Sequence, residues 1–249
     1  RTTGIAREQV VELANEIREL GAEVTPTTSA ELLRFAEIAG QLGTNSTEDI
    51  LLLVNAAEQL GVATNIAGDE AATLLSRILQ STGEGIPAIG NLSSSVVELG
   101  NNFAAREDEI VNFTREIVTA TRDINLSSAA AAGLGTTLAV AGQRAEASRT
   151  AISRLSQAIR RAGTEGGESL ERLAQITGQT TDQLQENLGE RSEQIILDFV
   201  RGLARVQEQG GVTLDVLRQF GIDGQEAAGV FNGLTAQVDT LARALDQSS

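Results

Sequence analysis

Four glutamates are the residues of this sequence whose type and spacing could perform acid–base chemistry. Glu107 and Glu109 stand two positions apart, and Glu168 and Glu171 stand three positions apart. A glycosidase that cuts cell wall needs two carboxyl groups, one as the acid and one as the base or nucleophile. All four glutamates fall where helices are expected to begin, and carboxylates there stabilise the positive end of the helix dipole. That simpler interpretation accounts for them, so we predict no catalytic residue.

The composition lacks the residues on which most other active-site chemistry depends. The chain contains no His and no Cys, and all 19 of its basic residues are Arg. This excludes the usual zinc and copper sites, a Ser-His-Asp triad, a thiolate nucleophile and a lysine Schiff base. The sequence therefore predicts a protein that is not an enzyme, has no small-molecule substrate or cofactor, and offers no cofactor-binding residue and no metal ligand.

One local group of basic residues stands out in this acidic chain, with only Glu146 against it. Its members are Arg144, Arg149, Arg154, Arg160 and Arg161. The functional interpretation is a contact patch for an acidic protein partner, since complementary charge favours association. The alternative is an ordinary solvated helix face. The sequence alone leaves both open.

Charge and length restrict the partners and the domain organisation. The 249 residues carry a formal net charge of −15, whereas nucleic-acid binding by charge neutralisation needs a basic surface. We therefore expect no specific nucleic-acid binding. The length suits one large domain or two small ones. The chain begins with Arg1 and contains no Met, which indicates a piece of a longer protein.

The spacing of apolar residues predicts helices throughout. In residues 35–79, apolar residues recur at helical spacing in three segments, with Gly43 and Gly61 as the expected ends of the first two. Residues 5–20 and 227–245 show the same periodicity, and no segment shows strand alternation. We predict an all-α fold, a compact multi-helix domain of about ten short helices arranged as stacked helical hairpins. The expected core includes Leu53, Phe113, Ile117, Ile152, Phe199 and Leu203.

A segment rich in Gly, Pro and Ser interrupts this pattern at residues 81–95. We predict a single domain over residues 1–249, with sub-units at 1–80 and 96–249 on either side of this connector. A hinge and an ordinary long connector are both consistent with such a composition. Residues 163–167 and Gly189 mark further expected breaks between helices.

Residues 124–143 carry no charge, and their number is close to that of a membrane-spanning helix. Their apolar members are mostly alanine, and three glycines interrupt them. Small and polar residues contribute little to membrane insertion. We therefore predict that the segment forms a pair of closely packed helices. The alternative function is that of a membrane-perturbing or pore-forming domain.

Several of these segments, taken in order, resemble the core region of phage tail tape measure proteins. The resemblance covers about residues 5–245. It is carried by AEIAGQLG at 36–43, DILLLVNAAEQLGVAT at 49–64, EAATLLSRIL at 70–79, VVELGNNFAAREDEIVNFTREI at 96–117, ILDFVRGLARV at 196–206 and LRQFGIDGQEAAGVFNGL at 217–234. The shared motif is a packing pattern, so it assigns no catalytic or ligand residue.

The resemblance implies a structural role. Proteins of the tape measure family set the tail length, act as a scaffold inside the tail tube and are released into the host at infection. The implied location is the lumen of the virion tail, and the host cytoplasm during assembly. The implied partners are the tail tube protein, tail assembly chaperones, tail tip or baseplate proteins and other copies of the chain, with host-membrane contact at infection.

Overall fold

The computed structural model describes residue 15 and residues 29–41, 46–64 and 66–248. Over these residues the chain forms 13 α-helices and two 3₁₀ helices, and no strand. The all-α prediction is confirmed. The expected helix at residues 5–20 and its successor's end at Gly43 lie outside the described residues.

The helices are short and follow one another closely along the chain. In order they are α2 Ser29–Gln41, α3 Thr47–Ala63, α4 Gly68–Thr82, η1 Ile86–Ala88, α5 Ile89–Asn102, α6 Glu107–Ala120, η2 Arg122–Ile124, α7 Ser128–Val140, α8 Ala145–Glu165, α9 Gly167–Thr177, α10 Thr181–Asn187, α11 Ser192–Glu208, α12 Thr213–Gln219, α13 Gln225–Ala236 and α14 Val238–Gln247.

Local signals in the sequence set many of the helix ends. Ser46 accepts a hydrogen bond from the Asp49 amide at 3.0 Å, which caps α3. Ser127 caps α7 in the same way through the Ala130 amide. Gly178 ends α9 in the left-handed conformation, with φ at 75°.

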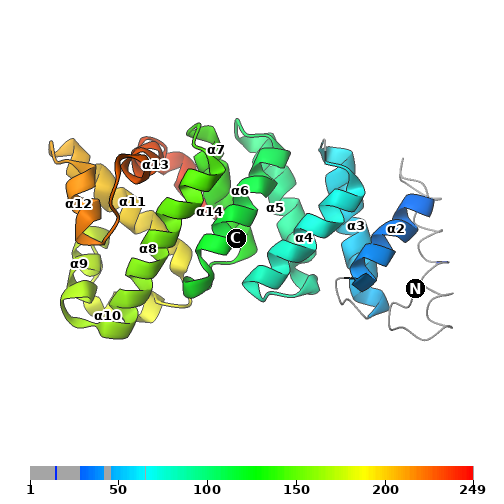
Figure 1. Ribbon diagram of the computed structural model, residues 1–249, viewed down its shortest axis with the longest axis horizontal. Helices are drawn as coiled ribbons and strands as arrows, with labels where there is room; N and C mark the ends of the chain where they lie inside the picture. The colour runs from blue at the N-terminus through cyan, green and yellow to red at the C-terminus, as the bar shows by residue number, and fades with distance from the viewer. Residues whose placement is uncertain (1–14, 16–28, 42–45, 65, 249) are drawn as a thin grey trace.

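Helices α2 to α6 form a stack of hairpins. Each of them packs against the next helix along the chain and also against the one after it. Short connections make successive helices antiparallel neighbours, and contacts to the second neighbour stack one hairpin on the next. Figure 1 shows the result as a row of helices from α2 at one end to α9, α10 and α12 at the other.

Helix α7 lies at the centre of the molecule and packs against α5, α6 and α14. Every residue from Ser128 to Leu138 is buried. The prediction of a pair of helices in residues 124–143 is wrong, because α7 is one uninterrupted helix. Its glycines are contact points for neighbours: a Cβ on Gly135 would lie 2.9 Å from the Phe113 Cβ, and one on Gly133 would lie 2.8 Å from the Ala244 carbonyl oxygen.

The predicted end of a helix at Gly61 is also wrong, since α3 continues to Ala63. A Cβ on Gly61 would lie 3.3 Å from the Cα of Gly68 on α4. The glycine therefore permits a close approach of two helices and does not end one.

The connector predicted at residues 81–95 is largely helical, which corrects the expectation of a long loop. Only residues 83–85 lie outside a helix, and Gly90 is the second residue of α5. Ser93 and Ser95 are buried in α5, and the Ser93 hydroxyl donates to the Gly90 carbonyl at 3.1 Å. Serine is tolerated here because the helix itself satisfies its hydroxyl. The division into sub-units 1–80 and 96–249 stays a prediction.

The expected continuous helix over residues 227–245 is divided into α13 and α14. Gln237 leaves the helical conformation, with φ at −118° and ψ at 28°. The break turns α14 back so that it packs against α7, α11 and α5. By contrast, the breaks expected at residues 163–167 and at Gly189 are confirmed, since Gly166, Gly167 and Gly189 all have positive φ.

One continuous hydrophobic core runs through the described residues, from Phe35 to Leu245. All six predicted core residues are buried, which confirms that part of the prediction. Phe199 is fully buried at the centre of an aromatic group, with its ring edge-on to those of Phe220 and Phe231 at centroid distances of 5.2 and 5.9 Å.

Candidate functional site

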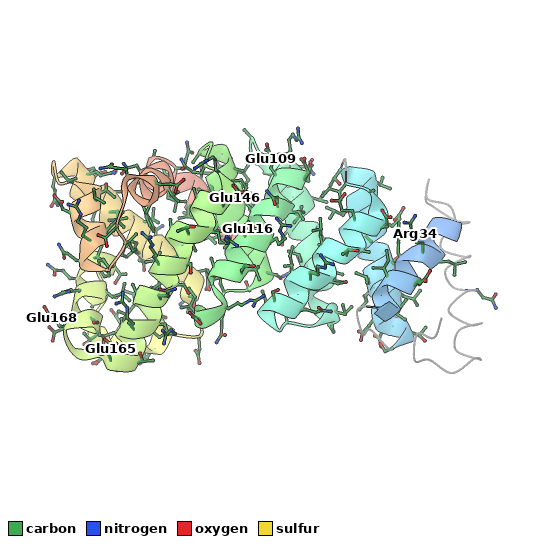
Figure 2. The ribbon with its side chains drawn as sticks, in the orientation of Figure 1. Arg34, Glu109, Glu116, Glu146, Glu165 and Glu168 are labelled. Carbon is green, nitrogen blue, oxygen red and sulfur yellow. The ribbon has the colours of Figure 1, made fainter. Side chains whose placement is uncertain are left out.

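Glu109 and Glu168, one from each candidate pair, have structural partners and lie far apart (Figure 2). Glu109 accepts from the Arg106 amide at 3.3 Å and so closes the capping box of α6. Glu168 forms an ion pair with Arg172, four residues further along α9. Figure 2 shows Glu109 at the upper edge of the molecule and Glu168 at the lower left corner, so no substrate could lie between them. Their roles in the structure are those of helix-start carboxylates.

The strongest electrostatic contact at these helix starts is between Arg106 and Asp108. The Arg106 Nε donates to Asp108 Oδ1 at 2.9 Å, and a second guanidinium nitrogen bonds Oδ2. This hydrogen-bonded contact lowers the pKa of Asp108 and raises that of Arg106. The pair lies at the surface, where Asp108 also lines a shallow groove with Glu70, Glu109 and Arg115. Over the described part of the chain, no group of three acidic side chains is placed to hold a metal ion.

The five arginines predicted as a contact patch belong to α8 and its N-cap, but they do not form one surface. Arg149 and Arg160 are separated by about three helical turns and share one face. The Arg149 Nε lies 3.4 Å from Glu116 on α6, and the Arg160 Nε lies 3.7 Å from Asp123 in η2. This first row faces the hairpin stack.

A second row points to the other side of α8. Arg154 donates to the Asp223 carbonyl oxygen, and Arg161 donates to the Phe220 carbonyl oxygen at 2.9 Å. Arg144, at the helix start, pairs with Glu226 on α13. The arginines therefore flank both edges of the buried face of α8 and hold it to its neighbours. Their role in contacting a partner stays a prediction. Some of the N–H donors of these arginines already bind groups of the same chain.

Sequence reasoning did not single out three other arginines, which the fold brings to one groove. Arg191 and Arg201 belong to α11 and its N-cap, and Arg243 belongs to α14. Between them lies a groove of about 470 Å³ whose lining includes Leu197 and Leu245. More than forty positions separate Arg201 from Arg243 in the sequence, so no local pattern could have indicated the group.

No helix among the described residues is long and apolar enough to cross a membrane. The uncharged segment that motivated the membrane alternative is the buried helix α7, whose 13 residues are enclosed by other helices. A bilayer-spanning helix needs about 20 apolar residues. The fold thus uses the segment as the centre of the protein core.

Comparison with known families decides the classification. The sequence model of the family described as Phage-related minor tail protein matches residues 14–213. The chain belongs to this family. No curated protein and no solved structure matches the chain. Membership in the phage-related minor tail protein family makes the chain a phage tail protein, in agreement with the resemblance of its sequence segments.

The matched region covers most of the architecture described above. Within the described residues it includes the hairpin stack, the central helix α7 and the arginine-bearing helix α8, and it ends at the first residue of α12. Helices α13 and α14 follow the matched region.

Proposed function

We propose that the chain is a structural assembly domain of a tail tape measure protein, part of the scaffold that sets tail length and is released at genome ejection. The observation that carries this proposal is the family match over residues 14–213 of the 249, read together with the ordered segments that resemble the tape measure core. The match supports a tail protein, and the segments support the narrower role.

The character of the fold supports a structural role of this kind. Side-chain hydrogen bonds and ion pairs join neighbouring helices or cap helix ends, as those of Arg149, Arg161 and Glu109 do, and many others stay within one helix, as that of Thr114 does. Buried threonines such as Thr136 and Thr137 bond to carbonyls of their own helix. Polar groups used in this way fix the packing of helices and leave none of them directed at a substrate.

The proposed location follows from the role. During assembly the domain is in the host cytoplasm, where tail assembly chaperones and tail tip or baseplate proteins would bind it. In the finished virion it lies in the tail lumen, against the tail tube protein. A net charge of −15 keeps copies of such a chain apart before they are assembled.

The length function is tested in the phage that encodes the chain, by an in-frame deletion of the codons for residues 89–143, which carry α5 to α7. We expect tails that are absent or altered in length, measured by electron microscopy of purified particles. Gly229→Ala, at an exposed glycine with open space around its Cα, is the matched control. Normal numbers of tails with an unchanged length distribution in the deletion phage would contradict the proposal.

Release at ejection is tested separately on intact virions. Genome ejection is triggered with purified receptor, the particles are sedimented, and the pellet and supernatant are probed with an antibody to the domain. We expect the domain in the supernatant, while the tail tube protein stays in the pellet as the control. A domain that remains in the pellet after complete ejection would contradict the released-scaffold role.

A further inference from the structure

The groove between α11 and α14 has an apolar floor and a basic rim. Leu197 and Leu245 are almost fully buried at its base, and Ala242 is half-buried beside them. Arg191, Arg201 and Arg243 line the same groove. The two helices pack directly on each other, although they come from opposite ends of the last sixty residues (Figure 1).

The three guanidinium groups retain most of their donors. Arg191 forms no ion pair or side-chain hydrogen bond with the described residues. Arg201 has one contact of 3.3 Å with Asp198, whose carboxylate already accepts hydrogen bonds from two glutamine amides at 2.8 and 2.9 Å. Since a guanidinium carries five N–H donors, both groups can bind further acceptors.

Arg243 is positioned by an aromatic contact that leaves its charge available for an ion pair. Its guanidinium carbon lies 4.9 Å from the centroid of the Phe103 ring, in a cation–π contact. Stacking of this kind uses the face of the guanidinium and leaves its N–H edge available. Phe103 thus positions the arginine at the groove.

Charge distinguishes this groove from the protein as a whole. The three arginines are accompanied there by Glu193 and Asp246, and Asp198 pairs with Arg201 beside the groove, so the local charge is close to balanced. The whole chain carries a net charge of −15. Complementary charge selects partners and suppresses wrong ones, and guanidinium groups pair with carboxylates in a bidentate geometry. Carboxylates of a partner therefore meet less repulsion here than elsewhere on the chain, whereas a second copy would bring its own net charge of −15 against this one and is disfavoured.

The spacing along α11 indicates the form of that partner. Arg191 precedes Leu197 by about 9 Å along the helix axis, and Arg201 follows it by about 6 Å, at 1.5 Å per residue. A helix lying in the groove could set an aliphatic side chain on Leu197 and Leu245. Its carboxylates, one to two turns away on either side, would reach the arginines. Helices bind apolar grooves through such spaced anchors.

We propose that the α11–α14 groove binds an acidic amphipathic helix of a partner protein. The aliphatic residue of that helix packs on the apolar floor, and its flanking carboxylates pair with Arg191 and Arg201. This proposal concerns a binding surface of the folded chain and stands whether or not the chain sets tail length.

The test uses the full chain and a synthetic probe. The probe is a capped alanine-based helical peptide of about four turns, with one leucine, glutamates about a turn before and after it, and a terminal tryptophan. The chain contains no Trp, so indole fluorescence anisotropy reports the peptide alone. We expect saturable binding that weakens as salt is added, and binding at least about fivefold weaker when the glutamates are replaced by glutamine.

The protein side of the test is the double variant Arg191→Gln with Arg201→Gln. It should lower the affinity for the glutamate peptide by about fivefold or more, while circular dichroism and the melting temperature show an unchanged fold. Arg77→Gln, at an exposed arginine of α4 that also has no ion-pair partner among the described residues, is the matched control and should leave the affinity unchanged.

Four results would overturn the proposal. They are no saturable binding of the glutamate peptide, equal binding of the glutamate and glutamine peptides, an equal loss of affinity in Arg77→Gln, and dissociation of a dimer into monomers by the double variant. The last result, seen by sedimentation velocity, would show that a second copy covers the groove.

Discussion

Gly202 of α11 lies directly against the backbone carbonyl of Ile176, at the end of α9. A Cβ at position 202 would overlap the Ile176 oxygen and lie 2.9 Å from its carbonyl carbon. One turn further along α11, the Arg205 Nη2 donates to the same oxygen at 3.0 Å. The close approach of these two helices therefore requires a residue without a side chain at position 202.

The first prediction concerns this contact. Gly202→Ala forces α9 and α11 apart or strains them, so we expect a loss of about 1–3 kcal/mol in the free energy of unfolding, measured by urea denaturation. Gly229→Ala in α13, where the added methyl meets nothing within 4 Å, is the control. It should gain about 0.5–1 kcal/mol, because alanine loses less backbone entropy than glycine in a helix. Equal effects at the two sites would contradict the packing argument.

The aromatic group around Phe199 gives a second prediction. Phe199→Ala removes a fully buried ring that contacts Phe220 and Phe231 edge-on, so it should cost about 3–5 kcal/mol of unfolding free energy. Val212→Ala changes a side chain that is 59% exposed and should stay within about 0.5 kcal/mol of the parent. Chemical denaturation of both variants measures the difference. A small loss at Phe199 would mean that this core is not packed as described.

Two neighbouring arginines of α8 should behave differently. Arg161 donates to the Phe220 carbonyl at 2.9 Å, whereas Arg160 lies 3.7 Å from Asp123 with both side chains about half exposed. Arg161→Gln should cost about 0.5–1.5 kcal/mol and speed amide exchange in residues 221–224. Arg160→Gln should change stability by less than about 0.5 kcal/mol. Hydrogen exchange with mass spectrometry distinguishes the two variants. Identical exchange in both would show that Arg161 does not hold residues 221–224 in place.

The fourth prediction concerns pH. The hydrogen bond from Arg106 holds the pKa of Asp108 below its ordinary value in the folded protein. The pair therefore stabilises the fold at pH values above the ordinary Asp pKa of about 3.9, and this contribution is lost as the pH falls through the lowered value. In Arg106→Gln the pKa of Asp108 should rise toward its ordinary value. Carboxyl ¹³C NMR titration measures this, and an unchanged titration midpoint would rule out the Arg106 contact as its cause.

The sequence by itself determined the fold class, much of the core and several helix ends. Apolar residues at helical spacing identified Ile152, Phe199 and Leu203 as buried, because periodicity is a local property of the chain. Gly189 was identified as a break for the same reason: the signal and the structure lie within a few residues of each other.

Only the tertiary structure decided what the ambiguous residues do. Gly61 and Gly133 look like helix breakers in sequence, yet each lies inside a helix, with the backbone of another helix close to where a side chain would stand. The arginines of α8 look like one patch, yet the helical twist divides them between two sides. Arg201 and Arg243 meet at a groove because α14 turns back at Gln237. These outcomes depend on which distant segments pack together, and contacts between distant segments leave no periodic trace in the sequence.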